Sequence, residues 1–375
     1  MKIAINLLYM LPGIVGGTET YAAGLVHSMA EMNQRDEFVI FVNRESAAWP
    51  LPKAPNFTRV VCPVRAVSQG QRYLFEQLHL PRLLVAYKAD LVHSLGYVGP
   101  LLSPCPSVVT IPDLNYITMK NTMTLKRRVA LYFFSTQAAR RADHVITISD
   151  FSKGEINRAI KLPPGKISVT HLGPMRNCGT NSSGNWAQLN RQYGIRGPYV
   201  AAFGGFSLHK NIPRLIRAFS AVKDEFPHSL VLLGLIPSNA DLSEESIGRG
   251  VKDRIITTGY VPEEHILPLL AQADLFVLPS LYEGFGLPVL EAQQAAVAVA
   301  CSSAASLPEV GGDGALYFDP TSVENIAQTI RHCLVNSELR TQLIQKGKEN
   351  LKRFSWKKTA QETLTIYRNV YSPGA

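Results

Sequence analysis

The 375-residue sequence predicts an α/β protein made of two doubly wound domains in tandem. Short apolar runs alternate with stretches of helical periodicity, which is typical of parallel sheets covered by helices on both faces. The alternation stops at a polar, glycine-rich segment, residues 173–184, and then starts again. At about one domain per 150 residues, the length also favours two domains, each able to bury its own core.

The first series occupies residues 1–172, which we interpret as one Rossmann-like domain. A strand at residues 3–9 leads into a loop with Gly13, Gly16 and Gly17, followed by a helix from Glu19. The glycine spacing does not match the G-x-G-x-x-G pattern of a dinucleotide site. Further strands are expected at residues 39–42, 60–61, 91–93, 107–111 and 144–148, and helical stretches at about 69–88 and 124–142.

A linker is predicted over residues 173–197 and a second Rossmann-like domain over 198–355. In the second domain, strands are expected at 199–203, 230–235, 255–260, 275–278 and 297–301, and helices at about 211–226, 262–273 and 287–295. A last helix within residues 356–375 is expected to pack back on the first domain. Open α/β sheets bind ligands at the carboxyl ends of their strands, so the loops there are the candidate sites.

Composition favours a reducing, cytoplasmic setting. The five cysteines are odd in number and form no C-x-x-C pair, which argues against a disulfide framework or a thiolate zinc site. Lys2 followed by the mostly apolar residues 3–15 resembles a short signal peptide. Asn6 interrupts the apolar run, however, and we predict a buried strand instead. No uncharged apolar run approaches the roughly 20 residues that span a bilayer.

Charge is concentrated in the first half of the chain. Residues 1–175 hold 19 basic and 11 acidic residues, whereas residues 176–375 hold 19 and 18. This asymmetry predicts an acidic partner for the first domain, and the absence of nucleic-acid-binding motifs favours an anionic membrane surface over nucleic acid.

The stretch Glu283-Gly-Phe-Gly-Leu-Pro-Val-Leu-Glu291 carries the strongest chemical signal. Two carboxylates bracket a glycine-rich turn that opens a helix, with Pro288 where a first-turn proline fits. Amides at a helix start bind phosphate, and flanking carboxylates accept hydrogen bonds from sugar hydroxyls. An ordinary capped turn, with Glu291 as a first-turn acid, is the alternative.

Several motifs in order resemble a known family. They are Gly16-Gly17-x-Glu19, Val145-Ile-Thr-Ile-Ser-Asp-Phe-Ser152, Lys210-Asn-Ile-Pro, Gly259-Tyr260-Val261, the 283–291 stretch and Leu307-Pro-Glu-Val. The chain resembles the retaining GT-B glycosyltransferases of glycosyltransferase family 4 nearly end to end. This resemblance implies two Rossmann-like domains facing a central cleft, with the acceptor on the first and a nucleotide sugar on the second.

The resemblance also implies roles for individual residues. Lys210 is expected to contact the donor phosphates, Glu283 the sugar hydroxyls and Glu291 the ribose. His93 is expected to contact the donor sugar or acceptor. An equal alternative is a structural histidine at a sheet end, whose ring nitrogens form hydrogen bonds within the protein. Asp113 is expected to steer the acceptor hydroxyl or act as an auxiliary base. Further substrate-binding positions are Gly16, Gly17, Gly205, His209, Tyr260, Val261, Gly284, Phe285, Gly286, Leu287 and Pro288.

Two positions depart from the family pattern. Pro112 stands where many relatives carry a histidine, and Gly205 where many carry an arginine on the phosphates. His209 is a candidate substitute for that arginine. These losses give some weight to a catalytically idle GT-B binding subunit, although Lys210, Glu283 and Glu291 are all present.

The resemblance favours mannose, from GDP-mannose, and synthesis of a cell-surface polysaccharide such as lipopolysaccharide, or a lipid-linked glycan. Glucose, galactose and rhamnose donors remain open, and an epimerase or phosphorylase of similar fold fits less well. No D-x-D motif or metal-ligand spacing occurs, so we expect no metal and no cofactor beyond the donor substrate.

The basic, aromatic segment from Leu125 to Phe134 has two interpretations. It either lies on the inner face of an anionic membrane, making the protein peripheral there, or places Leu125, Val129, Tyr132 and Phe133 in the core at helical spacing. The core interpretation is slightly favoured.

Overall fold

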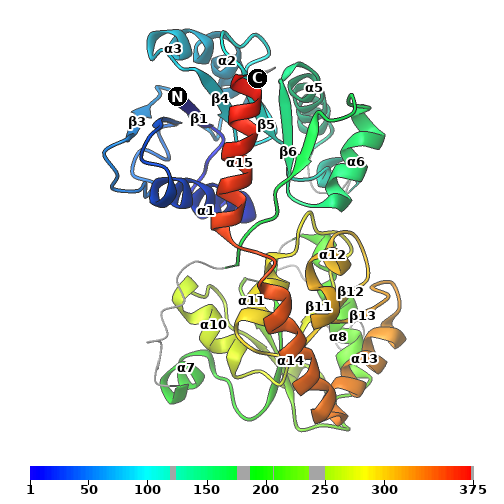
Figure 1. Ribbon diagram of the computed structural model, residues 1–375. Helices are drawn as coiled ribbons and strands as arrows, with labels where there is room; N and C mark the ends of the chain where they lie inside the picture. Colours follow the sequence, from blue (N-terminus) through cyan, green and yellow to red (C-terminus); the bar gives the residue numbers. More distant parts are fainter. Residues whose placement is uncertain (119–123, 175–185, 206, 236–249, 373–375) are drawn as a thin grey trace. The chain divides into compact units, whose positions relative to one another are not determined.

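The computed structural model describes residues 1–118, 124–174, 186–205, 207–235 and 250–372. The chain forms two compact units: Met1–Gly173 together with Ser355–Ala375, and Pro174–Phe354. Each unit is a parallel sheet with helices packed around it (Figure 1). The α/β class predicted from the alternating pattern is therefore confirmed. Part of the predicted linker, residues 175–185, lies outside the described residues.

The sheet of the first unit has the order β3-β2-β1-β4-β5-β6-β7, and neighbouring strands are parallel. The strand order reverses between β1 and β4, which is where open α/β sheets bind ligands. The strands are β1 (Lys2–Leu7), β2 (Glu37–Val42), β3 (Phe57–Val61), β4 (Leu91–Ser94), β5 (Ser107–Thr110), β6 (His144–Thr147) and β7 (Ile167–Val169).

Helices from both ends of the chain cover this sheet. The last helix, α15, packs against α1 within the first unit (Figure 1). The contact is close, because a Cβ on Gly24 would lie 2.3 Å from Cδ2 of Trp356. The helices of this unit are α1 (Gly17–Met32), α2 (Gln69–Leu78), α3 (Leu80–Ala86), α4 (Asn115–Thr118), α5 (Leu125–Arg141), α6 (Asp150–Ile160) and α15 (Trp356–Tyr371).

The second unit has the sheet order β10-β9-β8-β11-β12-β13, again parallel throughout. Its order reverses between β8 and β11, so the loops after these strands flank the expected ligand position. The strands are β8 (Tyr199–Phe203), β9 (Ser229–Leu233), β10 (Ile255–Thr257), β11 (Leu275–Leu278), β12 (Val299–Ser302) and β13 (Leu316–Phe318). The helices are α7 (Trp186–Tyr193), η2 (Leu208–Lys210), α8 (Ile212–Ser220), η3 (Lys252–Arg254), α10 (Glu263–Ala271), α11 (Leu287–Gln294), α12 (Leu307–Gly311), η4 (Gly312–Gly314), α13 (Val323–Val335) and α14 (Ser337–Leu351).

Several predicted boundaries were wrong for local reasons. The single helical stretch at 69–88 is two helices, because Pro81 fits the first turn of a new helix and not the interior of an old one. The strand expected at 255–260 ends at Thr257, ahead of Gly259, whose φ is 68°. The helix expected to reach residue 226 ends at Ser220. The short strands β7 and β13 were missed, and α7 lies inside the predicted linker.

The core interpretation of the 125–134 segment was also wrong. Leu125, Val129, Tyr132 and Phe133 are 43–62% exposed, whereas Ser135, Ala138 and Ala139 in the carboxyl-terminal half of α5 are buried. Within the described ranges, every helix is too short or too polar to cross a membrane.

Candidate active site

An ion pair between Lys210 and Glu283 lies at the carboxyl end of the second unit's sheet. Lys210 ends η2, and its Nζ donates to Glu283 Oε1 at 2.8 Å. Glu283 lies in the loop between β11 and α11. The two side chains are 23% and 13% exposed, so the pair is largely shielded from water without being sealed off. The fold thus brings together Lys210 and Glu283, both of which the sequence analysis assigned to the same sugar donor.

Two serines that the sequence analysis did not select hold Glu283 in place. Ser280 Oγ donates to Glu283 Oε1 at 2.7 Å, and Ser306 Oγ donates to the carbonyl oxygens of Glu283 at 2.8 Å and Phe285 at 2.7 Å. Burial acts to raise the pKa of Glu283, but Lys210, Ser280 and His209 together outweigh it and hold that pKa below its usual range. Glu283 is therefore an ionised, oriented acceptor.

The turn between Glu283 and α11 requires glycine at position 286. Gly286 has φ 111°, and a Cβ there would lie 2.6 Å from Cδ2 of Leu307. Pro288 occupies the first turn of α11, as the sequence predicted. The amino end of α11, which begins at Leu287 and carries a partial positive charge, therefore follows directly on Gly284, Phe285 and Gly286.

Glu291 lies further along α11 and is half-buried. Burial, with a contribution from Glu263, raises its pKa to about 7, while Lys210 opposes the rise. Glu291 is therefore only partly ionised near neutrality, unlike Glu283. Its contact with a ribose stays a prediction.

Gly205 and His209 lie close to the ion pair. A Cβ on Gly205 would come within 3.2 Å of Cγ of Lys210, so the missing side chain leaves room for the lysine stem. The His209 carbonyl accepts from the Leu281 amide at 2.7 Å, which ties η2 to the loop after β11. Burial lowers the pKa of His209, Glu283 opposes that shift, and Lys210 adds to it. His209 is thus neutral at pH 7, which weakens it as a substitute for an arginine.

Asn211 is a positioning residue that the sequence analysis missed. Its Nδ2 donates to the carbonyl oxygens of Pro279 at 2.9 Å and Pro320 at 2.8 Å, and its backbone has φ 60°. It therefore fixes the end of η2 between two strand-end loops. The signal was in the sequence, because asparagine adopts this conformation more readily than most residues.

Tyr260 and Val261 follow β10 on the same edge of the sheet. Tyr260 is 75% exposed, whereas Val261 packs against the core. The structure thus leaves Tyr260 available to a ligand and gives Val261 a packing role. Their contact with the donor base stays a prediction.

In the first unit, the glycine loop is closed by Glu19. Its Oε2 accepts from the Gly13 amide at 2.8 Å, and its Oε1 accepts from Trp49 Nε1 at 3.1 Å. Gly16, with φ 55°, precedes α1, and no described atom lies within 4 Å of a Cβ placed on Gly16 or Gly17. The backbone at these two glycines is accessible to a ligand.

The structure corrects the assignment of His93 as a substrate contact. His93 has no exposed surface, and burial lowers its pKa to about 3. Its Nδ1 lies 2.6 Å from the hydroxyl of Tyr367, and its Nε2 lies 2.8 Å from Oγ1 of Thr110. Because both ring nitrogens are engaged inside the unit, His93 joins α15 to the sheet, which fits the alternative that the sequence left open.

Asp113 is half-buried in the loop after β5. Its Oδ1 accepts from the Tyr97 hydroxyl at 2.9 Å and from the Asn115 amide at 3.1 Å. Tyr97 holds φ 57°, a conformation that is rare for an aromatic residue. Pro112 is buried beside it, with no side-chain donor to take the place of a histidine. The carboxylate of Asp113 is therefore oriented from two sides, and its role toward an acceptor stays a prediction.

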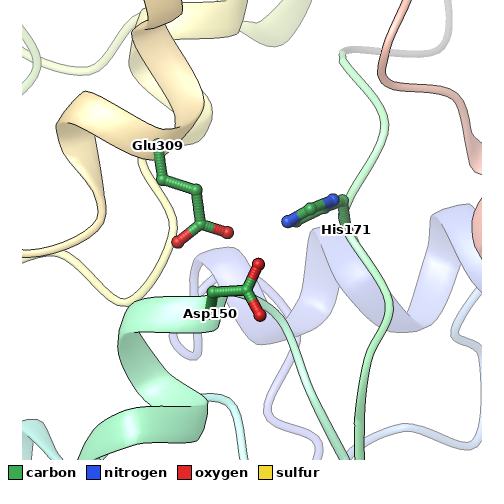
Figure 2. Close-up of side chains that lie close together, drawn as sticks. All are labelled: Asp150, His171 and Glu309. Carbon is green, nitrogen blue, oxygen red and sulfur yellow. The ribbon is translucent and has the colours of Figure 1, made fainter.

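Asp150 and His171 form a further polar pair in the first unit. Asp150 is the first residue of α6, His171 follows β7, and their oxygen and nitrogen atoms lie within 4.8 Å of one another (Figure 2). No local pattern predicts this pair, because the two residues come from separate elements. Glu309, also labelled in Figure 2, belongs to the second unit.

Two family models match the chain, one in each unit. "Glycosyltransferase Family 4" matches residues 15–173, and "Glycosyl transferases group 1" matches residues 190–350. The chain belongs to the GT-B glycosyltransferases of the family-4 type. Over 228 residues the chain is 34% identical to the O-antigen chain mannosyltransferase B of Escherichia coli. That match covers 60% of each chain, so it spans less than two thirds of the relative.

Solved structures share the fold over the full length. The glycosyltransferase superposes on sucrose-phosphate synthase from Thermosynechococcus elongatus with a TM-score of 0.77 at 18% identity, covering 100% of both chains. It superposes on Anabaena HepE, solved in complex with UDP and glucose, with a TM-score of 0.73 at 17% identity, covering 98% of this chain and 99% of that one. At these identities the likeness establishes the GT-B fold alone.

Proposed function

We propose that this glycosyltransferase moves a hexose from a nucleoside diphosphate sugar to an acceptor hydroxyl, with retention of configuration at the anomeric carbon. The observation that carries the proposal is the Lys210–Glu283 ion pair, set beside the Gly286 turn at the amino end of α11. A cation, a helix amino end and an ionised carboxylate within one loop cluster match a diphosphate joined to a polyhydroxylated sugar.

The leaving group determines what the second unit must stabilise. When the bond from the anomeric carbon to the phosphate oxygen breaks, negative charge develops on the diphosphate. Lys210 and the amino end of α11 supply positive charge there without any metal, so we propose metal-independent transfer. Binding of the diphosphate draws Lys210 away from Glu283, and the carboxylate is then available to the sugar hydroxyls. Glu291 accepts from the ribose in this arrangement.

The first unit holds the acceptor in our proposal. The acceptor oxygen attacks from the face that the diphosphate leaves, and the departing phosphate oxygen takes the acceptor proton. Asp113, already oriented by Tyr97, steers the acceptor hydroxyl. His93 has no part in these contacts, because both its nitrogens are used inside the unit. The Gly16–Gly17 backbone offers amides without side chains in their way.

Mannose from GDP-mannose is the donor we favour. Support comes from the E. coli relative, whose name assigns it to mannose transfer in O-antigen synthesis. We propose a lipid-linked or polysaccharide acceptor at the cytoplasmic side of the membrane. Glucose, galactose and rhamnose donors are the alternatives, because Lys210 and the α11 turn recognise the diphosphate that all of them share.

A donor panel tests the proposal. The protein is mixed with GDP-mannose, UDP-glucose, UDP-galactose or dTDP-rhamnose, and the melting temperature and the release of free nucleoside diphosphate are measured. A cognate donor at a hundred times its Kd adds about 2.7 kcal/mol of stability. We expect one donor to raise the melting temperature and to be slowly hydrolysed, and Glu283→Gln to lose both effects. The exposed Glu349→Gln, at 60% side-chain exposure, is the matched control.

The outcomes separate the hypotheses. A stabilising donor without hydrolysis or transfer would support the idle binding subunit, to which Pro112 and Gly205 give some weight. No stabilisation by any nucleotide sugar would overturn the assignment of Lys210 and Glu283 to a donor.

A further inference from the structure

Helix α5 is buried in its carboxyl-terminal half, whereas its amino-terminal half is largely exposed. Ser135, Thr136, Ala138 and Ala139 of the carboxyl-terminal half pack into the first unit. The amino-terminal half carries an apolar stripe at positions i, i+4, i+7 and i+8, which fall on one face of a helix. Its members are Leu125, Val129, Tyr132 and Phe133, which are 62%, 57%, 43% and 53% exposed.

Helices α2 and α3 also carry exposed apolar side chains. Helix α2 contacts α5, because the rings of Tyr73 and Phe134 have centroids 4.7 Å apart. Leu74 and Leu78 on α2 are 58% and 51% exposed, and Val85 on α3, which packs against α2, is 63% exposed. We call the exposed side chains of α2, α3 and α5 the apolar–basic face.

The charge of this face has a single sign. Lys126 and Arg127 on α5 and Arg82 on α3 are exposed, and Lys88 follows α3. The sequence contains one acidic residue in 62–89, Glu76, and none in 124–142. Glu76 is 1% exposed, so no carboxylate offsets the positive charge at the surface of these described segments.

We propose that the apolar–basic face docks on the surface of an anionic lipid bilayer. Apolar and aromatic side chains beside lysine and arginine match the boundary between headgroups and acyl chains, where rings and basic groups are both favoured. A second copy of the chain fits less well, because a symmetric dimer would place this uncompensated positive charge against itself. The proposal does not depend on which sugar is transferred.

Vesicle co-sedimentation tests the proposal on the full-length protein. Vesicles of phosphatidylcholine with phosphatidylglycerol are compared with vesicles of phosphatidylcholine alone, at low and at high salt. One variant, Val129→Glu/Phe133→Glu, places two carboxylates in the apolar stripe. A second, Lys126→Gln/Arg127→Gln, removes charge and keeps the stripe. The control is Val335→Glu on α13 of the second unit, which is 71% exposed and lies outside the face.

We expect binding to the anionic vesicles at low salt, and weak binding to neutral vesicles or at high salt. Each basic residue removed should weaken binding about fivefold, and the double glutamate variant should weaken it more than tenfold. Val335→Glu should bind like wild type, and all variants should keep the wild-type melting temperature and donor hydrolysis. Two results would overturn the proposal: no wild-type binding to anionic vesicles, or unchanged binding by the double glutamate variant. A concentration-dependent dimer that Phe133→Glu abolishes, without vesicle binding, would assign the face to self-association instead.

Discussion

In the ligand-free protein, Lys210 and Glu283 neutralise each other's charge. The carboxylate is kept ionised by the lysine and Ser280, although burial acts against it. In the proposed donor complex, the diphosphate would take over Lys210, and the sugar would meet a carboxylate that Ser280 and Ser306 continue to hold. Preorganised charge of this kind accounts for much of the rate gain in many enzymes.

Lys210→Met is expected to reduce transfer by about a hundredfold to a thousandfold, because the developing charge on the diphosphate loses its cation. Loss of the lysine also raises the pKa of Glu283, since burial is then less opposed. The measurement is kcat and KM with the cognate donor, with Lys352→Met, 71% exposed, as the control. A wild-type rate in Lys210→Met would remove Lys210 from the phosphate site.

Glu291 should make donor binding depend on pH. Its pKa of about 7 means that it is mostly protonated at pH 6 and mostly ionised at pH 8, and only the ionised form accepts from both ribose hydroxyls. We expect donor binding to be roughly tenfold weaker at pH 6 than at pH 8. Burial lowers the pKa of the neighbouring His209 below its usual value. Calorimetry with Glu291→Gln should show weak binding with little pH dependence, and an equal pH dependence in the variant would contradict the assignment.

At the scale of elements, the Gly286 turn determines where α11 begins. Gly286→Ala places a Cβ at φ 111° and 2.6 Å from Leu307. We expect a loss of about 1–3 kcal/mol of stability and a larger loss of activity, since the loop with Glu283 must shift. Gly194→Ala is the control, because Gly194 also has positive φ, 66°, but has no described atom within 4 Å of a Cβ. Melting temperature and donor hydrolysis distinguish the two, and full activity in Gly286→Ala would show that the turn tolerates a side chain.

The packing of α15 on α1 gives a second prediction. Gly24→Ala would push a methyl group into the Trp356 ring, so we expect a loss of about 1–3 kcal/mol from overpacking. Gly154→Ala, inside α6 with no described atom within 4 Å, should be neutral or stabilising. Thermal unfolding of both variants measures the difference. Equal melting temperatures would mean that α15 moves away at little cost.

Local patterns were sufficient where the cause of the structure is local. The alternating strands, the glycine-rich turn after Glu283 and the helix start at Pro288 all follow from residues within a few positions of each other. His93 could not be placed in this way, because its partner Tyr367 lies 274 residues further along the chain. The predicted burial of the apolar residues of α5 was wrong for a related reason. Apolar spacing identifies a face of a helix, but it does not show whether another element covers that face. Ser306 was missed because its partners are backbone carbonyls of another loop. For Asn211, the residue type indicates a positive φ but not the two carbonyls that its side chain contacts.

At the scale of the whole molecule, the buried carboxyl of Glu76 should make stability depend on pH. Glu76 is 1% exposed, accepts from Asn6 Nδ2 at 3.3 Å, and lies 4.0 Å from Nε of Arg72. Burial raises its pKa to about 7, while Arg72 and Asn6 oppose the rise. This folded-state pKa lies above the unfolded value, so the protonated carboxyl of Glu76 contributes to the free energy of unfolding. That contribution is fully present below about pH 4.5 and is lost as the pH rises through 7.

The expected loss between pH 5 and pH 8 is about 2–3 kcal/mol. Glu76→Gln should therefore melt close to wild type at pH 5 and roughly 5–10 °C above it at pH 8, since glutamine has no charge to bury. Glu349→Gln, in an exposed ion pair, should shift little at either pH. The same difference between Glu76→Gln and wild type at both pH values would mean that Arg72 fully compensates the buried charge. A difference that grows with pH would identify Glu76 as a source of instability in the first unit under alkaline conditions.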